Sequence, residues 1–276
     1  MKYATEVTKY NHDKPQYLER FDELIIVERD DGTIFDFMKK FSTKAFVIRL
    51  DNIHDFLENN TINSYDNFTK ENPEIDLKFS FYRATEYSQQ LIDLMREHGH
   101  RFFYDDYVRT WDSLTGYVKE GVTDIYIVEE ICFDLINVRK VVGDIRLRVI
   151  PHIAQSSYLK TPAMQKFFIR PDDVEFYEKY IDVFELLNLQ NPNASVTMQR
   201  IYQDAGWGGN LSEIITDFNL DIDNRDILPL FAQHRISCGK RCMKGSGCSL
   251  CNQYASLAKT IKDNGMLIDK YHEFST

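Results

Sequence analysis

Short apolar runs alternate with amphipathic runs from residue 24 to about residue 204, and this alternation restricts the fold more than any other feature. The eight apolar runs are rich in Ile, Val, Phe and Tyr and lie at residues 24–28, 45–50, 77–82, 101–104, 125–128, 147–150, 167–169 and 183–187. Runs of this length are typical of buried strands, and the amphipathic runs between them are typical of helices. Strands that alternate with helices pair in parallel. The sequence therefore predicts an α/β fold with a parallel sheet.

The ends of the amphipathic runs carry the residues that begin and end helices. Asp51 or Asn52 is placed to cap a helix that starts after the second strand. Gly99 follows a run with Leu91, Leu94 and Met95 on one stripe, and it is predicted to end that helix. The polar residues 60–76 are predicted to be an insertion between the second helix and the third strand.

Eight strand–helix units fit a closed (β/α)8 barrel of the TIM type. The same alternation could form an open doubly wound sheet. However, no glycine-rich dinucleotide or phosphate-binding loop follows any predicted strand, and we therefore favour the barrel. The alternation stops near residue 205. We predict a barrel domain over residues 1–204 and a C-terminal helical extension with a metal site over residues 205–276.

The clearest local motif lies in that extension. Four cysteines follow a C-x3-C-x5-C-x2-C spacing: Cys238, Cys242, Cys248 and Cys251. Nearby glycines allow the backbone to fold tightly around a centre, and nearby Lys and Arg side chains would offset the charge of four thiolates. A gap of five residues is short for a zinc ribbon, and closely spaced cysteines commonly hold a [4Fe–4S] cluster. We predict the cluster, with a compact Zn²⁺ site as the alternative.

Polar side chains occur at or just beyond the predicted strands, where a TIM-type barrel has its active site. The candidate catalytic or binding residues are Arg49, Arg83, Asp105, Glu129, Glu130, His152 and Arg170. Alternating carboxylates and guanidiniums suit a polar or anionic small substrate, which Arg binds bidentately. His152 also fits a purely structural role, and Cys132 fits either a nucleophile or a small buried side chain.

Charge and hydropathy limit the partners. With 33 Lys+Arg and 43 Asp+Glu the formal charge is −10, which disfavours a general DNA-binding surface. No segment has the roughly 18 consecutive apolar residues of a membrane span, and the first residues lack the apolar core of a signal peptide. We therefore expect a cytoplasmic protein, in which cysteines more often bind metal than form disulfides.

Two segments resemble a known family. EGVTDIYIVEEICFDLINVRKV (residues 120–141) is similar to the region of the peptidase U32-like group in which a strand brings acidic residues to a barrel mouth. FFIRPDDVEFYEKYIDVFEL (residues 167–186) resembles a later strand–helix unit of that group. The resemblance implies a barrel-like fold. It also implies a four-cysteine iron–sulfur cluster and oxygen-independent hydroxylation of RNA bases or quinone precursors, although this family's cysteines are more dispersed than those here.

Three functions remain open from the sequence. The first is a metal-binding barrel enzyme with U32-like redox or hydroxylation chemistry on a small polar or nucleotide-like substrate. The second is a non-redox hydrolase or lyase with structural zinc. The third is a non-catalytic interaction protein, in which the barrel is a scaffold that binds a protein partner.

Overall fold

Nine parallel strands form one continuous sheet in the computed structural model of the chain. The structure describes residues 1–8, 12–28, 33–41, 45–83, 86–128, 131–151, 167–186, 192–215, 218, 220–239 and 249–257, with the backbone alone at 192–196. The strands are β1 (Lys2–Val7), β2 (Glu23–Val27), β3 (Ala45–Leu50), β4 (Asp76–Phe81), β5 (Arg101–Tyr104), β6 (Tyr107–Val108), β7 (Asp124–Ile127), β8 (Arg146–Val149) and β9 (Val183–Glu185). Their order is β5-β4-β3-β2-β1-β9-β8-β7-β6.

The two ends of this order meet, and the sheet closes into a barrel. β5 and β6 are separated only by Asp105 and Asp106, so they are two halves of one interrupted strand. β5 pairs with β4, and β6 pairs with β7. The backbone N–H of Thr123, just before β7, donates to the carbonyl of Phe102 in β5 at 3.0 Å. Counting β5 and β6 as one strand gives the eight positions of a (β/α)8 barrel.

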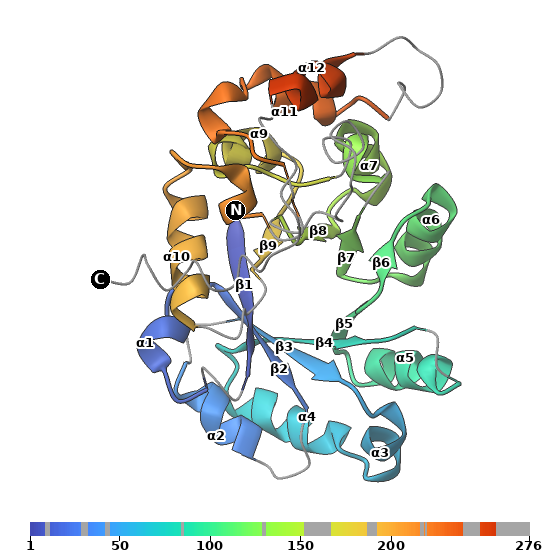
Figure 1. Cartoon of the computed structure of the whole chain (residues 1–276). Coiled ribbons are helices and arrows are strands. Elements are labelled where there is room, and N and C mark those ends of the chain that lie inside the picture. Colours follow the sequence, from blue (N-terminus) through green and yellow to red (C-terminus); the bar gives the residue numbers. More distant parts are fainter. Residues whose placement is uncertain are drawn as a thin grey trace.

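The helices surround the sheet on its outer side (Figure 1). They are α1 (Pro15–Leu18), α2 (Thr33–Lys39), α3 (Ile53–Glu58), α4 (Ile62–Glu71), α5 (Ser88–Glu97), α6 (Trp111–Glu120), α7 (Leu135–Val142), α9 (Val174–Tyr177), α10 (Pro192–Gln203), α11 (Leu230–Arg235) and α12 (Leu250–Leu257). The described residues also form four short 3-10 helices: η1 (Ile131–Phe133), η2 (Pro171–Asp173), η3 (Leu211–Glu213) and η4 (Asn224–Asp226). In the described part of the chain, no helix has both the length and the apolar character that a bilayer span requires.

Local sequence signals explain several helix ends. The Asn52 side chain accepts a hydrogen bond from the Asp55 N–H at 3.2 Å, so Asn52 is the cap of α3. Gly99 and Gly121 follow α5 and α6 with φ of +70° and +73°, a conformation that favours glycine. The chain thus turns directly from each helix into the next strand.

The structure differs from the sequence-based prediction in three places. The first strand, β1, was missed, because its short apolar stretch is interrupted by polar residues; it pairs with both β2 and β9. Residues 167–169 were predicted as a strand but pair with no strand among the described residues. Their apolar side chains are buried elsewhere: Phe168 packs against Phe218 with ring centres 4.9 Å apart. The predicted insertion at residues 60–76 contains α4, and its Tyr65 and Phe68 are buried.

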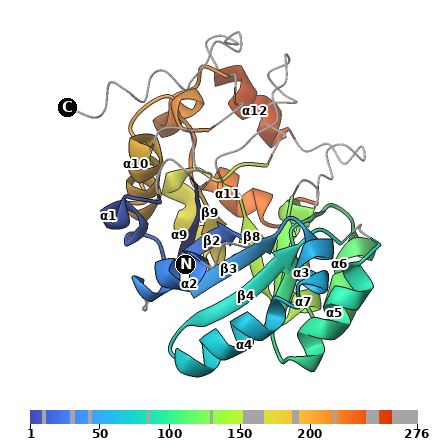
Figure 2. The ribbon, with the colours of Figure 1, turned by 90° about the horizontal axis from the view of Figure 1, so that it is seen from below.

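The described C-terminal segments lie at one end of the barrel (Figures 1 and 2). Arg170, the residue just before η2, donates to the carbonyls of Asn224 and Ile227 at 3.0 and 2.7 Å. Phe231 of α11 packs against Tyr254 of α12 with ring centres 4.9 Å apart. α11 and α12 are therefore in contact, and the region around η4 is bonded to a barrel loop.

Candidate functional site

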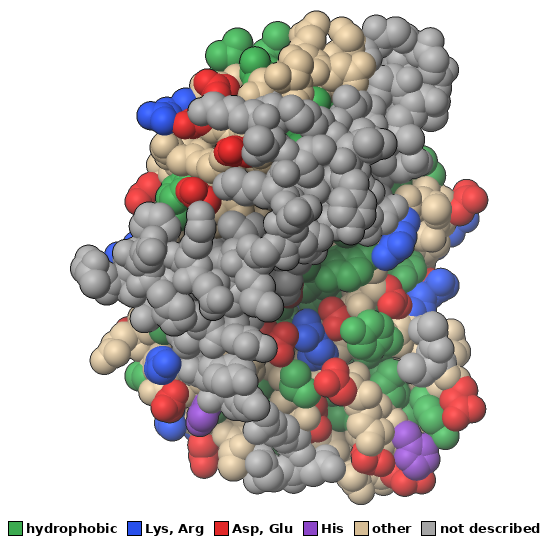
Figure 3. Space-filling view, viewed as in Figure 1, with side chains coloured by type: hydrophobic (Ala, Val, Ile, Leu, Met, Phe, Trp, Pro, Cys, Tyr) green, Lys and Arg blue, Asp and Glu red, His purple; other side chains and the backbone are tan. Residues whose placement is uncertain are grey.

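A polar pocket of ≈ 530 Å³ opens at the carboxyl ends of the strands. Glu6 lies near the end of β1, Arg49 near the end of β3, and Glu185 is the last residue of β9. Asp105 lies where β5 breaks before β6. The full lining is Glu6, Arg49, Tyr82, Asp105, Asp106, Tyr107, Arg109, Tyr117 and Glu185. Acidic and basic side chains gather side by side near the middle of the face shown in Figure 3.

Arg49 organises the acidic side chains of this pocket. Its Nη1 lies 2.9 Å from the Glu6 Oε2, and its Nε lies 2.8 Å from the Asp105 Oδ2. Burial opposes the charged guanidinium, but the neighbouring carboxylates, chiefly Asp105, outweigh burial and raise the pKa of Arg49. Arg49 is therefore a permanent cation, and its charge is already shared by two carboxylates before any ligand arrives.

Asp105 is the group best suited to exchange protons. Burial raises the pKa of Asp105 to about 6, with Arg49 opposing the shift and Glu185 adding to it. Its side chain is 11% exposed, so it borders the pocket while most of its surface is covered. A carboxyl group with this pKa exists in both protonation states near neutral pH, as a general acid or base requires.

Three phenols complete the lining. Burial, together with the carboxylates of Glu185 and Asp105, raises the pKa of Tyr107 to about 12. Asp105, followed by burial, raises the pKa of Tyr82. Burial and the Asp106 carboxylate raise the pKa of Tyr117 to about 12. These phenols stay protonated at neutral pH and can donate hydrogen bonds or lie against a ligand ring.

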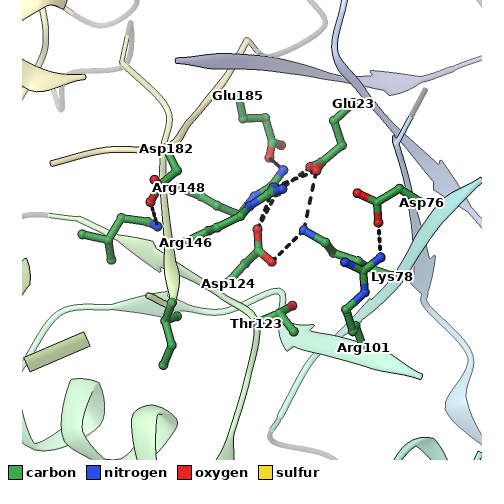
Figure 4. Close-up of polar contacts among 12 residues, drawn as sticks. Glu23, Asp76, Lys78, Arg101, Thr123, Asp124, Arg146, Arg148, Asp182 and Glu185 are labelled. Carbon is green, nitrogen blue, oxygen red and sulfur yellow. Dashed lines mark hydrogen bonds and ion pairs between the residues drawn. The ribbon is translucent and has the colours of Figure 1, made fainter. Parts of the chain in front are cut away.

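Glu185 connects the pocket to the interior of the barrel. It accepts a hydrogen bond from the buried Tyr126 hydroxyl. On its other side, the Arg148 Nη2 lies 3.6 Å from the Glu185 Oε2. The Arg148 guanidinium also lies over the rings of Phe103 and Tyr126, at 5.0 and 5.1 Å from their centres. Glu185 is thus held in place by buried groups below the pocket (Figure 4).

Arg148 belongs to a buried layer of alternating charges across the barrel (Figure 4). The layer consists of Glu23, Lys78, Asp124, Arg146, Arg148 and Glu185. Its members come from strands that are not all neighbours: Lys78 of β4 lies 3.1 Å from Asp124 of β7, and Arg148 of β8 contacts Glu23 of β2. Side chains of strands that are not neighbours in the sheet can form such ion pairs only across the interior of the barrel. Burial opposes ionisation of Glu23, but Arg148, Arg146 and Lys78 outweigh it and lower the pKa of Glu23 to about 2.

The structure separates the predicted site residues into groups. Arg49 and Asp105 line the pocket. Arg83 lies beside it, pairs with Glu120 of α6 and lies over the Tyr117 ring at 5.3 Å. Arg170 is buried and donates to both oxygens of Asp173 at 2.6 Å, so it stabilises the short helix η2 rather than lining the pocket. Glu129, Glu130 and His152 lie outside the described residues.

Several pocket residues were not among the predicted site residues. They are Glu6, Tyr82, Asp106, Tyr107, Arg109, Tyr117 and Glu185. Asp106 closely follows a predicted strand and Glu185 lies within the predicted strand at residues 183–187, so their positions gave a signal. Glu6 was missed together with β1. The tyrosines resemble the many core aromatics of this chain, and only the fold shows that Tyr82 and Tyr107 are 51% and 46% exposed.

The described metal-ligand candidates are Cys238 and Cys251, which are partly buried and form no disulfide with another described residue. Cys242 and Cys248 lie outside the described residues. Cys132 is fully buried in the core beside β7, in keeping with a packing role. On the surface of α3, His54, Asp55 and Glu58 also bring three ligand atoms within 4.8 Å of one another, an arrangement that is common without an ion.

The fold and the site define a (β/α)8-barrel protein with a polar, carboxylate-rich pocket at its mouth. Searched against protein-family models, the sequence matches none. It is 29% identical over 101 residues to the "uncharacterized protease MJ1657" of Methanocaldococcus jannaschii. This distant similarity covers 34% of the chain and 29% of that protein, so the match spans less than a third of the relative.

Among solved structures, the chain is similar to tryptophan synthases. Against one from Mycobacterium tuberculosis the TM-score is 0.48 with 10% identity, over 74% of this chain and 91% of the other. Against one from Pyrococcus furiosus the TM-score is 0.45 with 9% identity, over 74% and 94%. The barrel assignment rests on the strand order and closure described above.

Proposed function

We propose that this chain is an enzyme that transfers protons at the barrel mouth to or from a small polar or nucleotide-like substrate. The observation that carries the proposal is Asp105, whose pKa of about 6 coincides with its place in the pocket at the carboxyl ends of the strands. Catalytic groups of barrel enzymes gather at this end, and perturbed pKa values cluster at functional sites.

The neighbours of Asp105 suit this role. Arg49 fixes the orientation of the Asp105 carboxyl group and stabilises its ionised form. The phenols of Tyr82 and Tyr107 supply hydrogen-bond donors at the pocket edge. A bound substrate would displace water from Asp105, and this would raise its proton affinity further. Asp105 would therefore take up a proton as the substrate binds or release one to a leaving group.

The test is an anaerobic turnover screen with nucleosides and small polar acids, run separately with an added reductant and with an added two-electron oxidant, and read by mass spectrometry. Product formation by the wild-type chain should fall at least about 100-fold in Asp105→Asn, the usual range for loss of a general acid or base. Asp76→Asn is the matched control, since Asp76 is partly exposed and pairs with Arg101 away from the pocket. Equal turnover in the Asp105→Asn variant would contradict the assignment.

We also propose that the four cysteines bind a [4Fe–4S] cluster, and that the chemistry is of the U32-like redox or hydroxylation type. Four thiols within fourteen positions are a suitable donor set. Cys251 lies in the first turn of α12, and α12 packs on α11, which ends three residues before Cys238. Cys251 thus lies in one helix of a packed pair, and Cys238 follows the other helix closely. A bound cluster would supply one-electron transfer, while Asp105 would handle the protons.

Metal analysis decides this second proposal. Protein purified anaerobically should be brown and contain iron and sulfide, and Cys248→Ala/Cys251→Ala should lose both. A colourless sample with about one zinc per chain, as in a closed structural site, would instead favour the non-redox hydrolase or lyase. A chain with neither metal nor turnover would favour the scaffold function.

A further inference from the structure

Arg235, the last residue of α11, is buried inside a group of phenylalanine rings. It is 1% exposed. Its guanidinium carbon lies 4.5 Å from the ring centre of Phe168, 4.7 Å from Phe231, 4.9 Å from Phe133 and 5.8 Å from Phe167. We call this arrangement the Arg235 cage. A cation over aromatic faces is held most strongly when water is excluded, as it is here.

The cage joins barrel loops to the C-terminal segment. Phe133 is in η1, which follows β7, and Phe167 and Phe168 are in the segment that follows β8. Phe231 and Arg235 both belong to α11. Loops that follow strands lie at the carboxyl end of a barrel. α11 is therefore attached to the end of the barrel that also holds the polar pocket.

Two backbone hydrogen bonds extend this attachment to Cys238. The Leu135 N–H donates to the Ile236 carbonyl at 2.9 Å, and the Gly239 N–H donates to the Phe133 carbonyl at 2.8 Å. Gly239 has a φ of +52°, which glycine adopts readily. Cys238 lies between these two bonds, so its backbone is fixed against the loop that follows β7.

A buried guanidinium loses its hydration, and attraction to the Asp173 carboxylate and to the ring faces offsets part of this cost. A leucine or methionine could fill the same space but could not form the cation–π contacts with the four rings. All four ring centres lie within 5.8 Å of the guanidinium carbon, so these contacts restrict the position of the end of α11. The geometry therefore points to placement of the residues that follow Arg235.

We propose that Arg235 is a positioning residue that docks the end of α11 on the described residues after β7 and β8 and holds Cys238, the first cysteine of the motif, in place before metal binds. The purpose of this role rests on the proposed metal centre, and the role is the same whether the bound metal is iron or zinc. The Cys238 backbone would be ordered in the metal-free protein, and metal binding would then require ordering of fewer ligands.

Alkylation of the metal-free, reduced full chain with iodoacetamide tests the docking directly, with each cysteine read by peptide mass spectrometry. In Arg235→Met, the rate at Cys238 should rise about tenfold, as expected from the loss of about one buried cation–π site. Cys132 is fully buried and reports unfolding of the barrel, so its rate should stay at the wild-type level. The matched control is Arg225→Met, since the Arg225 side chain is 71% exposed in the same segment.

An unchanged rate at Cys238 in Arg235→Met would overturn the proposal. If Cys132 also becomes reactive in that variant, Arg235→Lys decides, because lysine keeps a cation in the cage. If Arg235→Lys raises the alkylation rate modestly at Cys238 and leaves the rate at Cys132 unchanged, docking is supported. If Arg235→Lys also makes Cys132 reactive, the proposal is overturned, because Arg235 would then be a residue of the barrel core. Loading with Fe²⁺ and sulfide, or with Zn²⁺, separates the two proposals. Docking with no metal bound would refute only the metal centre.

Discussion

Asp105 shows how one side chain takes its chemistry from its neighbours. An aspartate side chain exposed to water has a pKa of about 3.9, so it is fully ionised at neutral pH. In the pocket, burial raises the pKa of Asp105 to about 6, although Arg49 lies 2.8 Å away and opposes the shift. Desolvation therefore exceeds the attraction of the guanidinium. The same balance leads to two predictions, one for the proton affinity of Asp105 and one for the stability of the fold.

The pKa of Asp105 should move in opposite directions when its charged neighbours are changed one at a time. Arg49→Met removes a cation that stabilises the carboxylate, so the pKa of Asp105 should rise above about 6. Glu185→Gln removes a repelling charge, so the pKa should fall below about 6. Carboxyl ¹³C NMR titrations of the three proteins measure both shifts. Shifts of the same sign would contradict this view of the pocket.

Asp105→Asn should stabilise the fold at high pH. The pKa of Asp105 rises from 3.8 to about 6 on folding, so ionised Asp105 destabilises the native state. This cost is absent below pH 3.8, develops as pH rises, and is complete above about pH 6. Denaturant unfolding should show a gain of about 3 kcal/mol for Asp105→Asn at pH 8 and none near pH 3.5. A gain that is equal at both pH values would have another cause.

Among the elements, α6 shows how backbone conformation fixes the turn from a helix into a strand. Gly121 follows α6 with φ of +73°, and β7 begins three residues later at Asp124. Gly116 lies inside the same helix without a positive φ, and no atom lies within 4 Å of where its Cβ would be. The same amino acid therefore serves a conformational purpose at one position and none at the other.

Alanine substitutions at these glycines should have opposite effects. Gly121→Ala should destabilise the protein by about 1 kcal/mol, because alanine is strained at a positive φ. Gly116→Ala should stabilise it by about 0.5–1 kcal/mol, because alanine favours a helix interior. Thermal or denaturant unfolding of the two variants measures the difference. If both substitutions changed the stability in the same direction, side-chain contacts rather than φ would determine the effect of alanine at these positions.

In the molecule as a whole, the layer of charges inside the barrel links strands that do not touch in the sheet. Arg148 is fully buried and contacts Glu23, Asp124 and Glu185, from three different strands. Removing one member leaves buried charges without compensation, which is more costly than loss of an exposed pair. The layer also supports Glu185 below the pocket, so the stability of the barrel and the properties of the site are connected.

Arg148→Met should reduce the free energy of unfolding by about 3–5 kcal/mol, the usual cost of breaking a buried ion pair. Arg101→Met is the control, because Arg101 pairs with Asp76 in a half-exposed position, and its loss should cost less than about 1 kcal/mol. Urea unfolding at pH 7 measures both. Similar small losses in the two variants would mean that the interior layer adds little to stability.

Much of the fold was predictable because it depends on local patterns. The apolar runs at β2, β3, β4, β5, β7, β8 and β9 and the glycines after α5 and α6 indicate a βα barrel from sequence alone. β1 was missed and residues 167–169 were misassigned, because a short apolar run does not reveal which partner will cover it. Phe168 is buried against the C-terminal segment rather than in the sheet, and its own sequence does not indicate this.

The residues of the site also fall into two groups: those that the sequence indicated and those that only the tertiary structure brought together. The sequence placed Arg49 and Asp105 at strand ends, and it revealed the four-cysteine motif, which depends only on spacing. Only the tertiary structure brought Glu6 to Arg49, placed Glu185 above Arg148, and enclosed Arg235 in its cage. Local patterns act through residues a few positions apart, whereas proton affinity and docking depend on charges and rings that are distant in sequence and become neighbours only when the barrel closes.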